Sequence, residues 1–260
     1  MRIDFHTHGK LTKKLPFSTV YTDWMLKEAK NAGLDAICLT EHFNTLHFKE
    51  LYTYLMEQCK REGDTLITKE GLRIFTGMEI DIQECGHILS IGTPEENLEL
   101  NSRLEPYKEK GNFLPFDSLM DLLEEYEVII GGAHPFREGD SICEFPKEQL
   151  KRLHFLDLNG KDITLAEETR NKTNALAKEL NLPVVSGSDT HQAAQYGCIR
   201  TKFKEEVTTV NKLYEAIKQG HYSIEVSEYA QFQVQTADLL KKALKEIHAI
   251  GGDYVSILMS

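Results

Sequence analysis

Histidine is concentrated in a few short segments of this sequence. Six of the ten histidines lie in the segments DFHTH, LTEH, CGH, GGAHP and SDTH, and carboxylates accompany them at Glu79 and Asp189. These six are His6, His8, His42, His87, His134 and His191. Imidazole and carboxylate groups are ligands that suit zinc, manganese and iron alike. Their accumulation predicts a metal centre rather than a set of isolated structural histidines.

Two of these segments place a pair of side chains on one side of an extended chain. Successive side chains of a strand point to opposite faces, so His6 and His8 point the same way, and so do Asp189 and His191. Each pair can therefore hold one metal ion from one direction. A single H-x-H is weak evidence, because a buried histidine more often bonds a backbone group, but several such segments in one chain favour metal binding.

Short strands that alternate with helices are expected to position these residues. Apolar and β-branched runs predict seven strands, over 2–6, 35–40, 73–80, 87–91, 128–133, 154–158 and 183–187. Helical periodicity predicts helices over 19–32, 44–62, 116–126, 165–180, 208–219 and 232–249. The alternation is typical of an α/β fold with parallel strands and crossover helices, either an open sheet or a barrel. Active sites of such folds lie at the carboxyl ends of the strands, where most of these histidines are found.

The composition limits the class of protein. The chain has 260 residues, 41% apolar and 27% charged, which is typical of a globular protein. No run approaches the roughly 18 apolar residues of a membrane span, and the start MRIDFH lacks a signal-peptide core, so we expect a cytoplasmic protein without a membrane partner. Five widely spaced cysteines predict reduced thiols. The formal net charge of −11 disfavours a polyanionic partner, although bound divalent cations would reverse the field locally.

The order of the motifs adds a resemblance to a known family. H-x-H at the first strand end, T-E-H at the second, G-x-E, a separated histidine, A-H-P and G-S-D-T-H together resemble the polymerase and histidinol phosphatase (PHP) superfamily, over about residues 1–200. The resemblance implies a distorted barrel of seven β/α units, similar to a TIM barrel, with two or three divalent metal ions. We therefore expect one domain over 1–260, in which 201–260 is a helical segment packed around the barrel.

The resemblance also implies how the ligands divide among the metals. One metal would be held by His6, His8, Glu79 and Asp189. A second would be held by Glu79, His87 and His134, so that Glu79 bridges the two. A third would be held by His42 and His191 and one further ligand from the loop after the first strand.

That loop reads GKLTKKLPFS, and Lys14 stands where relatives commonly have the further ligand. A protonated lysine cannot ligate a cation, so the third site is in question. Either the ammonium group of Lys14, Lys10 or Lys13 replaces the third cation and pairs with phosphate, or the loop is a solvated basic turn.

The expected chemistry is phosphoester hydrolysis. Bridged cations would lower the pKa of a shared water, and the resulting metal-bound hydroxide would attack phosphorus. Arg137 and Arg200 follow two of the histidine motifs and are candidate phosphate ligands, because a guanidinium matches phosphate geometry. Asp189 or His191 is the candidate general acid for the leaving alkoxide.

The favoured function is hydrolysis of a small phosphomonoester, with histidinol phosphate as the substrate that the family suggests. The alternative enzyme is a phosphodiesterase or nuclease that acts on short oligonucleotides and would need a basic, aromatic groove. A noncatalytic metal-binding domain is the third interpretation. The metal, the exact substrate and the oligomeric state are not fixed by the sequence.

Overall fold

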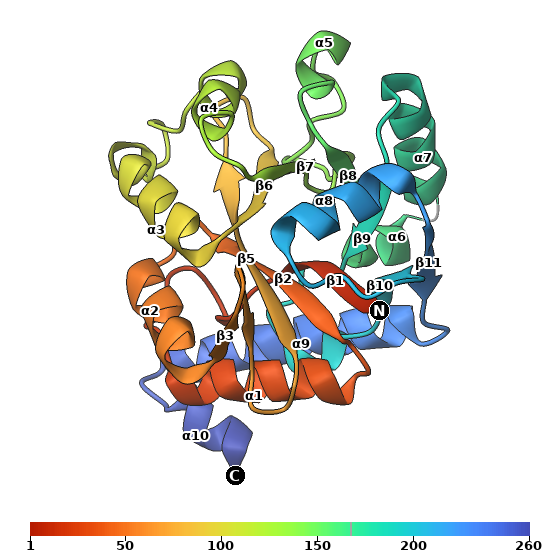
Figure 1. The fold of residues 1–260 in the computed structure, drawn as a ribbon. Helices are drawn as coiled ribbons and strands as arrows, with labels where there is room; N and C mark the ends of the chain where they lie inside the picture. Colours follow the sequence, from red (N-terminus) through yellow and green to blue (C-terminus); the bar gives the residue numbers. More distant parts are fainter. Residues whose placement is uncertain (167) are drawn as a thin grey trace.

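A curved sheet forms the frame of the fold. The computed structural model describes residues 1–166 and 168–260. Within them, strands run in the order β11-β10-β1-β2-β5-β6-β7-β8-β9, and the hairpin of β3 and β4 lies beside β5 (Figure 1). The strands are β1 (Arg2–Thr7), β2 (Ala36–His42), β3 (Lys60–Glu62), β4 (Thr65–Ile67), β5 (Arg73–Asp81), β6 (His87–Gly92), β7 (Ile129–Gly132), β8 (Phe155–Asn159), β9 (Val184–Gly187), β10 (Ile199–Phe203) and β11 (Tyr222–Val226).

β9 returns to β1 and nearly closes the sheet into a barrel. Thr7 and Thr190 form a parallel bridge, and the backbone N–H of Asp189 donates to the carbonyl of His6 at 2.7 Å. β10 pairs with β1 in the antiparallel direction near the amino end of β1. The closing contacts therefore lie at the carboxyl end of β1, next to the H-x-H segment.

All seven predicted strands are present, as β1, β2, β5, β6, β7, β8 and β9. The expectation of parallel neighbours is wrong for β6, which runs antiparallel to both β5 and β7. Residues 82–86 join β5 to β6, and this link is too short for a crossover helix. The reversal places His87, at the start of β6, opposite Asp81 at the carboxyl end of β5.

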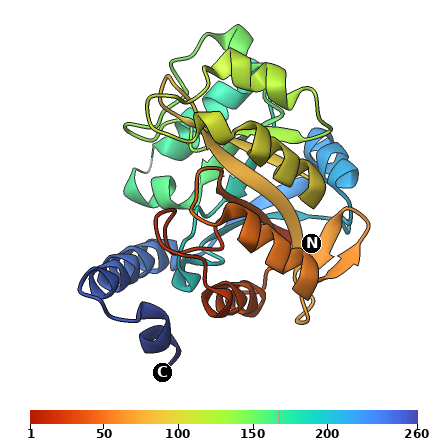
Figure 2. The same ribbon diagram turned by 90° about the vertical axis from the view of Figure 1, so that its left-hand side faces the viewer.

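Helices cover the outside of the sheet (Figures 1 and 2). They are α1 (Thr19–Asn31), α2 (Phe48–Gln58), α3 (Pro94–Arg103), α4 (Phe116–Leu123), α5 (Lys147–Leu150), α6 (Gly160–Leu165), α7 (Thr169–Leu180), α8 (Val210–Gln219), α9 (Ala230–Ala249) and α10 (Tyr254–Met259), with single 3-10 turns at η1 (Glu105–Tyr107) and η2 (Ala193–Gln195). α1 begins as predicted, because the Ser18 hydroxyl accepts from the N–H of Tyr21 at 3.3 Å. None of the described helices is long and apolar enough to cross a membrane.

The predicted C-terminal segment is only partly helical. α8, α9 and α10 lie within 201–260, but β10 begins at Ile199 and β11 follows α8, so two more strands extend the sheet there. The prediction of a helix over 44–62 is also wrong at its end, because Lys60–Glu62 forms β3. Short edge strands of exposed, charged residues carry little hydrophobic pattern, which explains why β3 was not expected.

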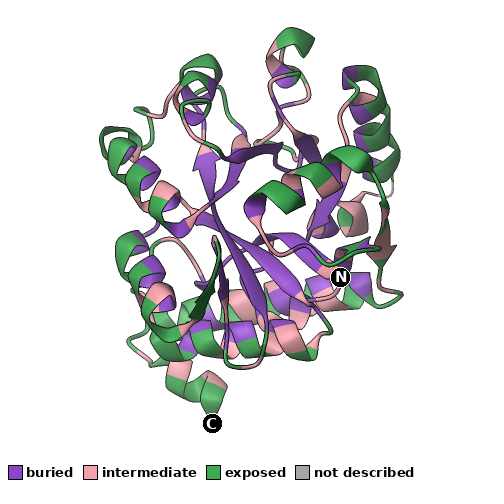
Figure 3. Ribbon diagram, viewed as in Figure 1, coloured by how far each residue is buried: buried purple, intermediate pink, exposed green. Residues whose placement is uncertain are grey.

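The core is divided by the sheet. Figure 3 shows most strands buried and the outer faces of the helices exposed, whereas β3 is exposed. Inside the barrel, Phe5 packs against Phe155 and Phe203, with ring centroids 5.8 and 6.1 Å apart. Leu213 and Ile217 of α8 join this inner cluster. Apolar side chains thus fill the interior of the barrel, and polar side chains gather at the carboxyl ends of its strands.

Candidate metal centre

Glu79 is the centre of the polar cluster at the carboxyl ends of the strands. It lies in β5, and only 1% of the residue is exposed. Five imidazole rings approach its carboxylate. Glu79 Oε1 lies 3.4 Å from His6 Nε2, 3.0 Å from His87 Nδ1 and 3.2 Å from His134 Nε2, and Oε2 lies 3.4 Å from His8 Nε2 and 2.9 Å from His42 Nδ1. One carboxylate is therefore shared by five histidines from four segments.

The first group of possible ligands is His6, His8, Glu79 and Asp189, whose donor atoms all lie within 4.8 Å of one another. Asp189 Oδ1 is 3.2 Å from His8 Nε2 and 3.6 Å from His6 Nε2. The alternation of side chains along β1 places both histidines on the inner side of the barrel mouth. The set expected for the first metal is thus brought together.

The second group is Glu79, His87 and His134. The Nδ1 of His87 lies 3.1 Å from His134 Nε2, and both atoms face Glu79 Oε1. The other ring nitrogen of His87 is 3.1 Å from Asp81 Oδ1, which orients the ring. Because Glu79 belongs to both groups, it has the position of a bridging ligand.

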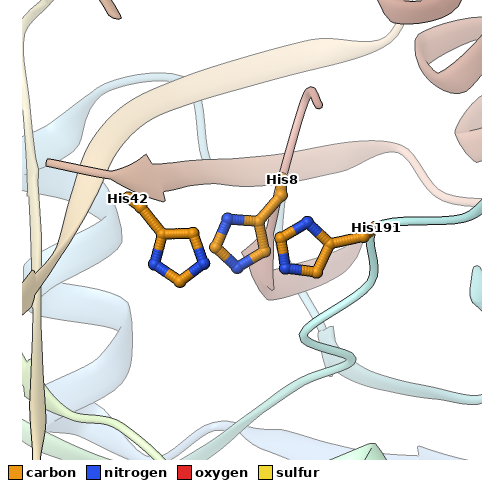
Figure 4. A group of neighbouring side chains, drawn as sticks. All are labelled: His8, His42 and His191. Carbon is orange, nitrogen blue, oxygen red and sulfur yellow. The ribbon is translucent and has the colours of Figure 1, made fainter. Parts of the chain in front are cut away.

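The third group is His8, His42 and His191. Figure 4 shows the three rings side by side, with His8 in the middle (Figure 4). The ring of His8 stacks on that of His191 with centroids 4.0 Å apart and on that of His42 at 4.5 Å. The expected pair of His42 and His191 is therefore present, and the third member of the group is His8, which directly follows β1.

Outer partners orient these rings. Asp157 Oδ2 lies 3.1 Å from His6 Nδ1, and the carbonyl of Lys10 lies 2.9 Å from His191 Nδ1. An N–H at each Nδ1 leaves the Nε2 lone pair free for a metal, which is the usual arrangement around metal-bound histidines. The protonation state of His191 also suits a ligand. Burial, reinforced by His8 and Lys241, holds its pKa well below the usual value, and a histidine must be neutral to bind a metal.

Several buried polar atoms in the cluster have no hydrogen-bond partner among the described residues. They include His6 Nε2, His42 Nδ1 and Glu79 Oε2. Buried polar atoms without partners are rare in folded proteins, and these three meet at the Glu79 carboxylate. Imidazole nitrogens and carboxylate oxygens are suitable donors for divalent transition metals. The residues therefore fit divalent metal ions.

Burial alone would raise the pKa of Glu79, but the imidazoles of His87, His42 and His6 hold it well below its usual range. For Asp189 the same effect comes from Arg137 and His6. Both carboxylates are therefore ionised, as metal ligands must be.

Two of these residues adopt backbone conformations that L-amino acids seldom use. The φ angle is 26° at His134 and 56° at Asp189. Such conformations cost of order 1–3 kcal/mol each and persist where the surrounding structure enforces them, often at functional sites. The backbone is thus strained at the points where two strands deliver their ligands.

Arg137 reaches the cluster, but protein acceptors occupy its guanidinium. Its Nε is 2.9 Å from Asp162 Oδ1, one terminal nitrogen is 2.6 Å from Asp189 Oδ2, and the other is 3.1 Å from Asn159 Oδ1. Arg137 therefore positions Asp189, and its capacity to bind phosphate is smaller than expected.

The basic loop does not provide the expected cation. Lys14 is exposed and does not line the cavity beside the cluster. The ammonium group of Lys10 is buried and donates to Thr45 and to the carbonyl of Leu46, and Lys13 pairs with Asp81 at 3.4 Å. The expectation that one of these lysines faces the substrate is therefore wrong, because each lies in solvent or has a partner outside the cavity.

Arg200 is also placed away from the cluster. It lies in β10, where its Nε donates to Glu225 at 2.9 Å and one terminal nitrogen approaches the carbonyl of Ala32. Ala32 follows α1 at the amino end of the barrel, so Arg200 faces the end opposite the histidines. The expected role of Arg200 in phosphate binding is wrong for this reason.

Lys161 and Lys241 line the cavity instead, and neither was predicted from the sequence. The cavity has a volume of about 170 Å³ and is bordered by cluster residues, by Lys161 of α6, and by Lys241 and Asp238 of α9. In α9 the buried residues Ala230, Val234, Ala237 and Leu244 follow helical spacing, and Lys241 occupies the one position of this series that is not apolar. A lysine within the apolar face of an amphipathic helix is the feature of the sequence that could have indicated Lys241 as a site residue.

Comparisons with known proteins identify one family match and several similar folds. Residues 167–222 match the family described as PHP-associated. No curated protein matches the chain. Among solved structures, PsfC from Pseudomonas syringae PB-5123 is similar over 94% of this chain and 98% of its own, with a TM-score of 0.78 and 22% identity.

Two further structures are similar. Endonuclease Q from Pyrococcus furiosus, described as lesion-specific, has a TM-score of 0.62 and 20% identity over 86% of this chain, which spans 57% of the endonuclease. A two-domain protein from Bacteroides vulgatus ATCC 8482, containing a predicted PHP-like metal-dependent phosphoesterase, has a TM-score of 0.59 and 18% identity over 91% of this chain and 69% of its own. At these identities the similarity shows a common fold.

Proposed function

We propose that this chain is a member of the PHP superfamily and a metal-dependent phosphoesterase that hydrolyses a small phosphomonoester. The observation that supports this most directly is the bridging position of Glu79 between two groups of imidazole and carboxylate ligands. The ligands border a cavity of about 170 Å³, which is below the 300–1,000 Å³ of typical sites for drug-sized ligands. A small substrate therefore suits the site.

The residues of the chain would act mainly by binding and orientation. His6, His8, Glu79 and Asp189 would hold one metal, and Glu79, His87 and His134 the other. Bound divalent ions would activate a water and stabilise the charge that develops on the phosphoryl oxygens. Arg137 and the strained backbone at Asp189 would keep the Asp189 carboxylate in place.

The general acid is a separate question. Asp189 is ionised, and His191 is neutral with its Nδ1 directed at the carbonyl of Lys10, so neither holds a proton toward the cavity. The contacts of both residues are those of ligands. We therefore propose that Asp189 and His191 serve the metals rather than the leaving group.

The test is hydrolysis by protein loaded with Mn²⁺, Zn²⁺ or Fe²⁺. A panel of small phosphomonoesters should release phosphate with at least one metal, and Glu79→Gln should lower the rate by more than the roughly 10–100-fold that loss of an outer partner costs. Metal analysis of Glu79→Gln should show fewer bound ions per chain. Failure of every metal form to release phosphate from any member of the panel would refute the proposal.

A phosphodiesterase acting on short oligonucleotides is the second candidate, favoured by the fold shared with endonuclease Q. Helix α9 borders the cavity on one side, and the net charge of −11 opposes a long polyanion. Comparing p-nitrophenyl phosphate with its bis(p-nitrophenyl) diester separates the two functions. A faster reaction with the diester would favour the phosphodiesterase.

A further inference from the structure

The side of the cavity facing the candidate metal ligands is a cluster of hydrogen-bond donors. It consists of Lys161, Lys241 and Gln192, which come from α6, from α9 and from the turn after β9. Both lysines are half-buried. Among the described residues, neither ammonium group has a hydrogen-bond or ion-pair partner, whereas the neighbouring Lys242 pairs with Asp238 at 2.7 Å. Two ammonium groups that line a cavity and have no paired acceptor among the described residues indicate an anionic ligand.

Gln192 points to the same conclusion independently. Gln192 is 1% exposed. Its Oε1 accepts from the N–H of Ala193 at 2.7 Å, which fixes the orientation of the side-chain amide. The Nε2 is then a buried donor without a partner among the described residues. A buried donor left without an acceptor destabilises the folded protein, so a bound oxyanion at this place would recover that loss.

The charge of the metal cluster explains why this anion is not simply the scissile phosphate. Glu79 and Asp189 offset two of the four positive charges that a pair of divalent ions would bring. The remaining excess matches a phosphomonoester dianion. Arg137 adds nothing to it, because Asp162 lies 2.9 Å from its guanidinium. The two lysines are therefore a second positive centre, reduced but not cancelled by Asp238, which already pairs with Lys242.

We propose that Lys161, Lys241 and Gln192 form a subsite for a second anionic group of the substrate, a carboxylate or a second phosphate a few bonds from the scissile ester. This inference rests on the proposed function and specifies its substrate class. It also argues against histidinol phosphate, whose ammonium group would lie beside two lysines. Burial lowers the pKa of Lys241 to about 8, with Lys161 and Lys245 adding to the effect, so its ammonium is mostly charged at pH 7 but poorly solvated.

The test measures binding, so that it does not depend on turnover. Isothermal titration calorimetry of the metal-loaded protein would compare phosphonopropionate with propylphosphonate, which have the same chain length and differ in the terminal carboxylate. We expect the carboxylate to tighten binding by about 10- to 100-fold, the range of one charge-assisted hydrogen bond. Ethylene bisphosphonate is the parallel probe for a second phosphate, and tighter binding of either probe with two anionic groups supports the subsite and identifies its anion.

The variants Lys241→Met and Lys161→Met should remove most of this preference while leaving the affinity for propylphosphonate within about threefold. Lys245→Met is the matched control, because it makes the same change one turn further along α9 at an exposed residue that does not line the cavity. Equal binding of propylphosphonate and of both probes with two anionic groups would overturn the subsite. An equal loss of affinity for all three probes in Lys241→Met would overturn it as well. If the protein prefers the probes with a second anionic group but hydrolyses no phosphomonoester, the subsite is supported and only the proposed reaction is contradicted.

Discussion

At the scale of single residues, the ring of His6 depends on a partner outside the metal groups. Asp157 and His6 are both fully buried, and Asp157 Oδ2 lies 3.1 Å from His6 Nδ1. Asn159 donates to the same oxygen at 3.0 Å and also contacts Arg137. A chain of hydrogen bonds thus joins the ligand on β1 to the arginine that holds Asp189.

Asp157→Asn should weaken metal binding without removing a ligand. The amide can still contact His6, but it carries no charge to hold the Nδ1–H tautomer, and the Nε2 lone pair is then less available. We expect metal affinity to fall by about 10–100-fold, measured by competition with a chelator of known affinity. Asp121→Asn is the control, because its side chain is 74% exposed and pairs with Arg152 on the surface. Equal metal affinity in Asp157→Asn and the unmodified protein would contradict the role of Asp157.

At the scale of elements, the barrel closes through an unusually close approach of β9 to β1. A Cβ atom added at Gly187 would lie 2.3 Å from the Cβ of His6 and 2.6 Å from its backbone nitrogen. Backbone atoms cannot yield as a flexible side chain can. Glycine is therefore required where the strand that leads to Asp189 passes the strand that holds His6.

Gly187→Ala should separate β9 from β1 and disturb the cluster at the same time. We expect a loss of about 1–3 kcal/mol in the free energy of unfolding, as for other overpacked sites, together with weaker metal binding. Urea denaturation and metal analysis would measure the two effects.

Gly9→Ala is the matched control for this prediction, because its added Cβ would meet only ordinary contacts of 3.5 Å with Leu51. It follows His8 directly, so it tests whether mere proximity to the cluster matters. Equal stability of Gly187→Ala and Gly9→Ala would show that the strands can move apart at little cost.

The elements also show what could be predicted from the sequence. Strands with apolar runs and helices with strong periodicity, such as α1 and α9, were expected at nearly the right places. The eight expected ligands lie together because each is at or near the end of a strand, and these ends meet at one mouth. The orientation of α9 toward that mouth depends on packing against α6 and η2, which involves contacts distant in sequence. For that reason Lys241 was not expected at the site, and Lys14 was.

At the scale of the whole molecule, one ion-pair group joins the first strand to the strands that follow residue 198. Glu225 of β11 accepts from Lys202 and Arg200 of β10 at 2.9 Å each and from Arg2 of β1 at 3.3 Å. Hydrogen bonds from Lys202 and Arg200 lower its pKa from 4.5 to about 2. Because the folded pKa lies below the unfolded value, this group stabilises the fold above about pH 4.5 and ceases to do so as pH falls toward 2.

Glu225→Gln should therefore be less stable than the unmodified protein at pH 7. The side chains of this group are partly exposed to solvent and screened, so we expect a difference of at most about 1 kcal/mol that shrinks with added salt. Urea denaturation at pH 7 and at several lower pH values should show the difference decreasing below about pH 4.5. Glu228→Gln, at an exposed residue on the loop after β11, is the control for the lost charge. A difference that is independent of pH would mean that packing, not charge, is responsible.

Removal of metal should affect the stability of the whole molecule without unfolding it. The apolar clusters inside and outside the barrel do not include the candidate ligands, so the fold has a core of its own. A ligand at about 1,000 times its dissociation constant adds about 4 kcal/mol to the stability of the folded state, or roughly 10 °C in Tm for a chain of this size. We therefore expect EDTA to lower Tm by about this amount while the far-UV circular dichroism at 25 °C stays unchanged. In Glu79→Gln the shift should be much smaller, because the shared ligand is gone before the chelator is added. If the unmodified protein, after incubation with metal, has the same Tm with and without EDTA, the cluster holds no metal. The proposed metal-dependent reaction would then be refuted.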